Sequence, residues 1–265
     1  GGTLVRLTGT DMGSMDPAAP PTATYGGDDG TKYSATSCYV DTDHEAVICE
    51  TAEGVGSDLR WIVTVGGQSS DLSPSPDALT SYAAPSITGL DMELQELHHT
   101  GLRTSGGERV VIHGLNMGPA TSDNVVRATY GGPGGTTYTA TGCVVDPSSP
   151  HTRMLCESAE GVGTDQQWLV TVGSQTSVLS GADVTTRYET VSVSSFRGAV
   201  EADTRGGEDV VLVGLNMGAV GEPVSVTYSS SMGVEYDAES CRVSVDHTEV
   251  TCRTVAGVGS GLAWR

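Results

Sequence analysis

Six cysteines are the residues of this 265-residue chain whose spacing most directly indicates a chemistry. None of them has the Cys-x-x-Cys spacing of a zinc site, and separations of 11, 13 and 11 residues suit two strands joined by a loop. A disulfide closing such a loop adds roughly 3 kcal/mol to stability by restricting the unfolded chain. Pairs of buried thiols are the alternative. We predict three disulfides, which would place the protein outside the cytosol: Cys38–Cys49, Cys143–Cys156 and Cys241–Cys252.

A histidine stands five residues before the second cysteine of each pair, at His44, His151 and His247. A histidine and carboxylates on one turn can hold a metal ion, which makes Asp41, Asp43 and His44 weak metal candidates. One histidine with two carboxylates is an incomplete ligand set, and this run lacks the glycine and glutamate of an EF-hand. A polar turn bonded to the backbone is the favoured interpretation, and we expect no metal and no cofactor.

The elements that must position these residues occur three times, in residues 1–13, 106–118 and 206–218. Each copy opens with Gly-Gly, continues with alternating apolar residues and closes with an Asp or Asn two residues before a glycine. An alternation of period two predicts a strand with one buried face, and the flanking residues predict turns. The copies begin 105 and then 100 residues apart, which predicts three units of sandwich size.

Further motifs recur within each unit. Two tyrosines eight residues apart flank a glycine- or serine-rich turn, which predicts a hairpin. A tryptophan opens a later strand on the same face as its valines, so we expect it in the core. These residues are Tyr25, Tyr33 and Trp61, then Tyr130, Tyr138 and Trp168, and then Tyr228, Tyr236 and Trp264.

The order of these motifs resembles the IPT/TIG domain, an immunoglobulin-like sandwich. A strand runs from Gly-Gly to Gly-x-Asn-x-Gly, a cysteine precedes an x-Gly-x-Gly turn, and a strand ends in Val-Thr-Val-Gly-Gly-Gln-Ser at residues 63–69. The chain departs from the family at residues 98–105 and 198–205, where a Pro-x-x-Gly-Pro run usually precedes the Gly-Gly. Such domains serve in receptors, adhesion proteins, transcription factors and accessory domains of starch-acting enzymes, so the resemblance alone does not give the function.

The resemblance implies an all-β fold of tandem immunoglobulin-like β-sandwiches in three repeats, the first and last truncated. We expect repeat 1 at residues 1–81 without its N-terminal strand, repeat 2 at 82–187, and repeat 3 at 188–265 without its C-terminal strand. This pattern indicates a window from a longer tandem array. The first junction is longer than the second, and we place the extra residues at 91–99 as an exposed loop.

Composition excludes several function classes. Asp and Glu number 33 against 13 Lys and Arg, and Lys32 is the only lysine, so the chain lacks the basic face that nucleic acid requires. No apolar run approaches the length of a membrane span. No nucleophile-elbow, zinc-protease, P-loop or dinucleotide motif occurs, and no carboxylate pair recurs at one place in all three units. We therefore expect no enzyme activity.

Two proline-rich stretches are candidates for O-linked or hydroxyproline-linked glycans, although loop rigidity explains them nearly as well. The candidate positions are Thr22, Thr24, Ser73, Pro74, Ser75 and Pro76.

The near-equivalence of the units predicts a structural role for the chain. We expect the building block of an extracellular fibre, filament or surface coat that associates with like chains. The alternative is the ectodomain of a cell-surface adhesin or receptor that binds a protein or glycan ligand. An exposed aromatic residue out of register with the other units would favour this alternative, and Phe196 is the candidate. A carbohydrate-binding module ranks third, because the tryptophans are expected in the core.

Overall fold

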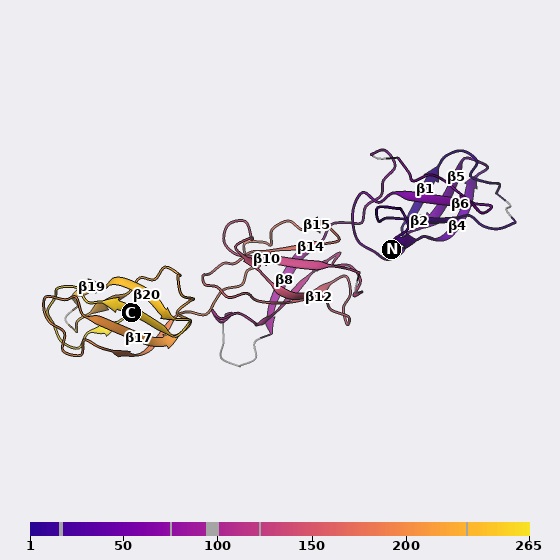
Figure 1. The fold of residues 1–265 in the computed structure, drawn as a ribbon. Coiled ribbons are helices and arrows are strands. Elements are labelled where there is room, and N and C mark those ends of the chain that lie inside the picture. The colour runs from indigo at the N-terminus through magenta and orange to yellow at the C-terminus, as the bar shows by residue number, and fades with distance from the viewer. Residues whose placement is uncertain (16–17, 75, 94–100, 122, 232) are drawn as a thin grey trace.

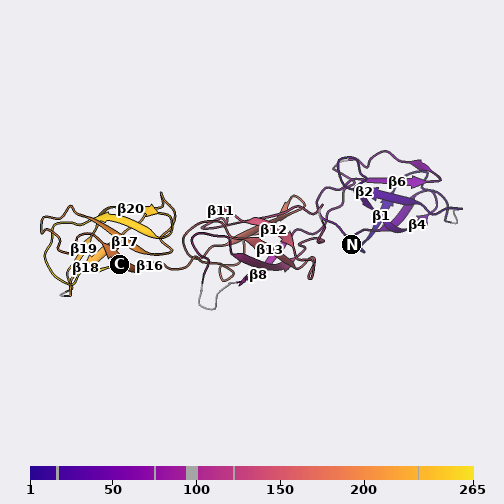
Figure 2. The same cartoon turned by 60° about the horizontal axis from the view of Figure 1, so that its bottom comes forward.

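The computed structural model describes residues 1–265 except 16–17, 75, 94–100, 122 and 232. Over the described residues every regular element is a β-strand, and all named strand pairs are antiparallel. Figures 1 and 2 show these strands gathered into three units that follow one another in a row. The chain is thus an array of tandem immunoglobulin-like β-sandwiches. In the described part of the chain, no helix has the length and apolar character needed to cross a membrane.

Each unit contains two sheets. In strand order, the first unit has β1-β5-β4 (Leu4–Thr8, Ala46–Glu50, Thr36–Thr42) and β3-β2-β6-β7 (Tyr33–Ser34, Thr22–Tyr25, Trp61–Val65, Gln68–Ser69). The second has β12-β13-β9-β8 (Thr141–Val145, Arg153–Glu157, Arg109–Leu115, Ser86–Glu93) and β11-β10-β14-β15 (Tyr138–Thr139, Val126–Tyr130, Trp168–Val172, Gln175–Thr176). The third has β16-β17-β21-β20 (Ser192–Arg197, Asp209–Leu215, Glu249–Arg253, Glu239–Val245) and β19-β18-β22 (Glu235–Asp237, Thr227–Ser229, Ala263–Trp264).

The core of each unit lies between its two sheets, where the alternating residues of the sequence meet. In the second unit Val110 and Ile112 of β9 are fully buried together with Trp168 and Val170 of the opposite sheet. Tyr130 stacks on Trp168 with ring centroids 4.1 Å apart. Trp61 and Trp168 therefore lie in the core, as their strand positions predict, whereas Trp264 is only partly buried against the core of the third unit.

One predicted loop is wrong in part. Asp91, Met92 and Glu93 continue β8 and pair with Val111, Val110 and Arg109 of β9. Met92 packs against the core of the second unit, so this segment belongs to the sheet. The rest of the predicted loop, residues 94–99, lies outside the described residues.

Tyr82 and Tyr188, the linker tyrosines, lie where the chain passes from one unit to the next. Each hydroxyl lies within hydrogen-bond distance of a core tyrosine of the preceding unit. The Tyr82 hydroxyl lies 2.7 Å from that of Tyr25 in the first unit. The Tyr188 hydroxyl lies 2.7 Å from that of Tyr130 in the second, and Tyr188 is buried there. The exact unit boundaries at 81–82 and 187–188 remain a prediction from the sequence.

Candidate functional site

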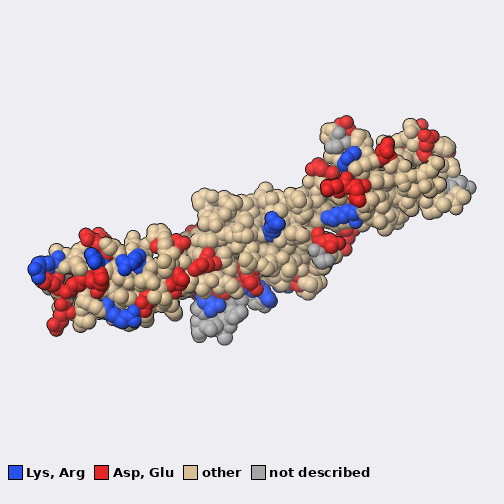
Figure 3. All heavy atoms as spheres, viewed as in Figure 1, with Lys and Arg blue, Asp and Glu red and all other residues tan. Residues whose placement is uncertain are grey.

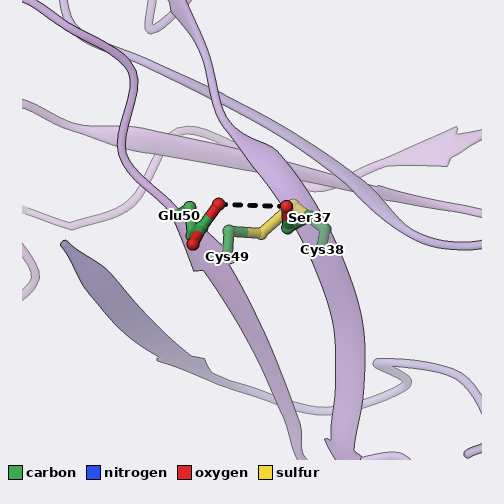
Figure 4. Close-up of a disulfide and its surroundings, with 4 residues drawn as sticks. All are labelled: Ser37, Cys38, Cys49 and Glu50. Carbon is green, nitrogen blue, oxygen red and sulfur yellow. Dashed lines mark hydrogen bonds between the residues drawn. A yellow bond between two sulfur atoms is a disulfide. The ribbon is translucent and has the colours of Figure 1, made fainter. Parts of the chain in front are cut away.

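The cysteines form three disulfides, each between neighbouring strands of one sheet. They join Cys38 to Cys49, Cys143 to Cys156 and Cys241 to Cys252, with Cα atoms 4.1, 4.1 and 4.0 Å apart. These are the pairs within units that the spacing predicts. Figure 4 shows the first of them beside Ser37, whose hydroxyl donates a 3.0 Å hydrogen bond to Glu50. Each disulfide therefore fastens two strands that the sheet already pairs.

A β-bulge precedes the first cysteine of every pair, and it was not predicted from the sequence. The residue before the cysteine has a left-handed backbone, with φ of 52° at Ser37, 58° at Gly142 and 51° at Ser240. The strand register shifts at the same place in all three units. A small residue before each first cysteine is the signal that was available, because small and polar residues tolerate this conformation best.

The three weak metal candidates have different partners. Asp41 pairs with Arg6 at 2.9 Å, and Asp43 accepts a 2.6 Å hydrogen bond from the backbone N–H of Met15. His44 has a left-handed backbone, with φ of 60°, as expected for a polar turn. Among the described residues, no group of three or more His, Cys, Asp and Glu side chains is placed to hold a metal ion.

His151 and His247, the counterparts of His44, lie at the junctions between units. The backbone N–H of His151 donates to the carbonyl of Gly118 at 2.9 Å, and its carbonyl accepts from Met117 at 2.9 Å. His247 makes the same two bonds with Gly218 and Met217, at 2.7 and 3.0 Å. The glycine turn that follows β9 or β17 thus fixes the histidine turn, and we call these two turns together the receiving face of a unit.

A glutamate of the preceding unit meets each of these histidines. The Glu53 carboxylate contacts Nε2 of His151 across the first junction. The Glu160 carboxylate lies 3.0 Å from Nε2 of His247 across the second. There Nδ1 of His247 also lies 2.9 Å from the hydroxyl of Thr104. Both junctions therefore carry the same ion pair whenever the imidazole is protonated.

A valine two residues after each glutamate is held by the second tyrosine of the hairpin. The hydroxyl of Tyr33 accepts from the N–H of Val55 at 3.1 Å and donates to its carbonyl at 2.9 Å. Tyr138 holds Val162 in the same way, at 3.1 and 3.0 Å. Tyr236 holds Val258 at 3.1 and 2.8 Å. This valine clamp recurs in all three units and fixes the turn that each unit presents.

The clamped Val55 inserts into the second unit, whereas Val162 lies against the third unit and is only half-buried. Val55 of the first unit is 6% exposed and belongs to the core cluster of the second. A Cβ added at Gly118 would lie 2.5 Å from a Val55 methyl group, and one at Gly173 would lie 2.6 Å from the other. At the second junction, a Cβ at Gly218 would lie 3.1 Å from Val162. The receiving face therefore needs glycine because the valine occupies the space of a side chain.

The third unit presents a different turn. Ala256 replaces the glutamate, and Val258 is 71% exposed. The first junction has one further bond, in which the Gln175 side-chain amide donates to the carbonyl of Tyr82 at 3.0 Å. Both junctions thus combine a clamped valine, a glutamate and a histidine, and the hydrogen bond from Gln175 is found at the first of them.

Burial dominates the electrostatics of the linker tyrosines. It raises the pKa of both Tyr82 and Tyr188, and the bonded hydroxyls of Tyr25 and Tyr130 raise it further. Hydrogen bonds from Ser148 lower the pKa of Asp146, which is 8% exposed and also pairs with Arg153 at 3.1 Å.

The glycan candidates lie in different surroundings. Thr22, Pro74 and Pro76 are exposed, and Thr24 is half-buried. The Ser73 hydroxyl accepts from the N–H of Trp61 at 2.9 Å and donates to the carbonyl of Ala78 at 2.7 Å, so it serves the fold. Ser75 lies outside the described residues.

Comparisons with known proteins add little to this geometry. No family model matches the chain, and no curated protein matches it. The chain is similar to a solved structure of FdeC, described as a broadly conserved Escherichia coli adhesin, with 13% identity and a TM-score of 0.24. The match covers 93% of this chain and 81% of that one. A likeness at this level carries no argument about function.

Proposed function

We propose that this chain is a non-enzymatic structural rod, built from sandwiches of IPT/TIG type, that serves as a building block of an extracellular fibre, filament or coat. The observation that carries the proposal is the repetition of one junction. A clamped valine and a glutamate of one unit meet a glycine slot and a histidine of the next, at Val55 and His151 and again at Val162 and His247. A repeated, side-chain-specific junction sets the angle between units and so favours a stiff array.

The disulfides support a location outside the cytosol. Disulfides persist in oxidising compartments, and three of them in one glycine-rich chain fit an extracellular or surface protein. Figure 3 shows acidic side chains over the first and third units, while much of the visible face of the middle unit carries neither acid nor base. We propose association of like chains along such a weakly charged face, with O-linked or hydroxyproline-linked glycans at exposed Thr22, Pro74 or Pro76.

Electron microscopy and small-angle X-ray scattering of the purified chain test this function. We expect straight three-lobed particles with a narrow distribution of lengths, and end-to-end or lateral assemblies as the concentration rises. A calcium chelator should leave both unchanged. Particles whose three lobes take uncorrelated directions would contradict the rod, and straight particles that stay single at every concentration would contradict the fibre.

A ligand-binding ectodomain, of an adhesin or a receptor, is the second candidate, and one observation favours it. Phe196 is 41% exposed and lines a groove of about 470 Å³ together with Tyr236 and Trp264. Aromatic side chains that line a groove are suited to a protein or glycan ligand. Glycan-array binding that Phe196→Ala abolishes would favour this candidate over the fibre.

A further inference from the structure

In the second unit, the sheet β11-β10-β14-β15 has one face turned away from the core. Buried residues alternate with exposed or half-buried residues along β10 and β14. Because the side chains of a strand alternate between two faces, the less buried ones point outward. We call the outward set the threonine face: Thr129, Thr139, Leu169, Thr171 and Thr176.

The side chains of the threonine face are held in place by the sheet and by one another. The hydroxyls of Thr171 and Thr176 lie 3.0 Å apart on paired strands. Thr129 stands opposite Thr139 on one side and Leu169 on the other. A threonine side chain is stiff because it is branched at Cβ. Covering this face therefore costs little further side-chain entropy.

The threonine face also lacks acidic residues. The four strands of its sheet, all of them described residues, contain no Asp or Glu, and Arg127 is their only charged residue. Arg127 lies towards the first junction, where it lines a groove together with Asp123. The opposite sheet of the same unit carries charges of both signs, among them His113 and Asp91, whose side chains lie 2.8 Å apart. The two faces of this unit therefore differ sharply in charge.

The neighbouring units carry charges where the second unit is neutral. The first unit has Asp28, Asp29, Lys32 and Asp71 at the positions where the second has Pro133, Gly134, Thr137 and Val178. In the third unit Asp237 takes the hairpin position of Thr139. The middle unit thus has an uncharged margin around its threonine face, which the equivalence of the units does not require.

We propose that the threonine face of the second unit is the surface through which two copies of this chain associate side by side. With 33 acidic and 13 basic residues, two copies repel each other, and they approach most easily where both faces are free of acid. A two-fold contact brings a surface against itself. A hydroxyl both donates and accepts hydrogen bonds, so identical threonine faces are complementary. This inference rests on the proposed fibre function and names its lateral contact.

Sedimentation of the chain of residues 1–265 over a range of concentrations tests the contact. We expect a monomer–dimer equilibrium that Thr139→Asp weakens about tenfold or more, because it places two carboxylates in a two-fold contact. The third unit holds Asp237 at this position, so the fold accepts the change, and urea titration checks it. Thr88→Asp is the matched control, since Thr88 is exposed on β8 of the opposite sheet, and it should leave the dimer unchanged.

Salt provides a second arm that needs no variant. Sodium chloride screens the repulsion between acidic chains, so the dimer of the unaltered chain should become tighter between about 20 and about 300 mM salt. A dimer that salt weakens would overturn the proposal, because ion pairs would then hold it. Association that Thr139→Asp leaves unchanged would overturn this contact and leave the fibre function standing. A chain that stays monomeric at every concentration would overturn both.

Discussion

At the scale of single residues, the tyrosine hydroxyl that clamps the valine is the contact most open to test. In the second unit this is the hydroxyl of Tyr138. Among the described residues it is the only hydrogen-bond partner of both the backbone N–H and the carbonyl of Val162. Tyr138→Phe leaves both backbone groups without that partner, and we expect the chain to lose about 1–3 kcal/mol of unfolding free energy in urea titration. Tyr39→Phe is the control, because Tyr39 is 49% exposed, and it should cost little. Equal losses for the two variants would refute the clamp.

The buried linker tyrosines predict a loss of stability in alkali. Below about pH 10, Tyr82 and Tyr188 are neutral in both the folded and the unfolded chain, so they add no pH dependence. Above it the unfolded chain ionises them, while burial keeps the pKa of each raised in the folded chain. Stability should therefore fall by up to about 1.4 kcal/mol per pH unit for each such group. Melting temperatures from pH 8 to 12 measure this, and Tyr188→Phe should reduce the slope; an unchanged slope would contradict it.

Residue types and spacings predicted the positions of these contacts better than their partners. The sequence indicates the cysteine pairs because their separations are local and repeat in each unit. It does not indicate that His151 meets Glu53, because the two are 98 residues apart and in different units. The fixed interval from glutamate to valine was visible, but only packing shows that this turn faces the next unit. From the sequence the histidine was therefore interpreted as part of a polar turn, with a metal site as the weaker alternative.

At the scale of elements, the disulfides hold strands that are already neighbours. The backbones of β12 and β13 pair beside the Cys143–Cys156 bond, so we expect the pairing to persist without it and the stabilisation to come from the smaller entropy of the unfolded chain. Replacing both cysteines by serine should cost roughly 2–3 kcal/mol and leave the sheet intact. Denaturant unfolding with circular dichroism measures the cost, and reduction of the unaltered chain serves as the comparison. Loss of the β-sheet spectrum without denaturant would contradict this account.

The strand β8 shows why one element was assigned to a loop. Its apolar residues Ile87, Leu90 and Met92 do not keep a period of two, because the register shifts between Ile87 and Gly89. A bulge inserts one residue and moves the later side chains to the other parity. The sequence therefore looked like a strand that stops early and an insertion of mixed polarity. The extra length of this junction was recognised, but its place in the sheet depends on pairing with β9.

At the scale of the whole molecule, the stiffness of the array depends more on the valine than on the ion pair. Exposed ion pairs contribute about 0–1 kcal/mol, and both Glu53 and Glu160 are more than half exposed. Val55 is buried in the neighbouring unit, and its truncation to alanine removes two methyl groups at a cost of about 1–3 kcal/mol. The junction is thus held mainly by packing, and the histidine and glutamate fix its orientation.

We therefore expect the loss of the valine side chain to loosen the first junction more than the loss of the glutamate charge. Val55→Ala should broaden the distribution of distances between fluorophores on the first and second units, while Glu53→Gln should broaden it only slightly. Val178→Ala provides the control, because Val178 is 78% exposed and lies outside the junction, and it should leave the distribution as in the unaltered chain. Single-molecule energy transfer resolves these widths, and urea titration checks that each unit stays folded. If Val55→Ala leaves the distance distribution as narrow as in the unaltered chain, the junction does not set the angle between units, and the linker residues must do so instead.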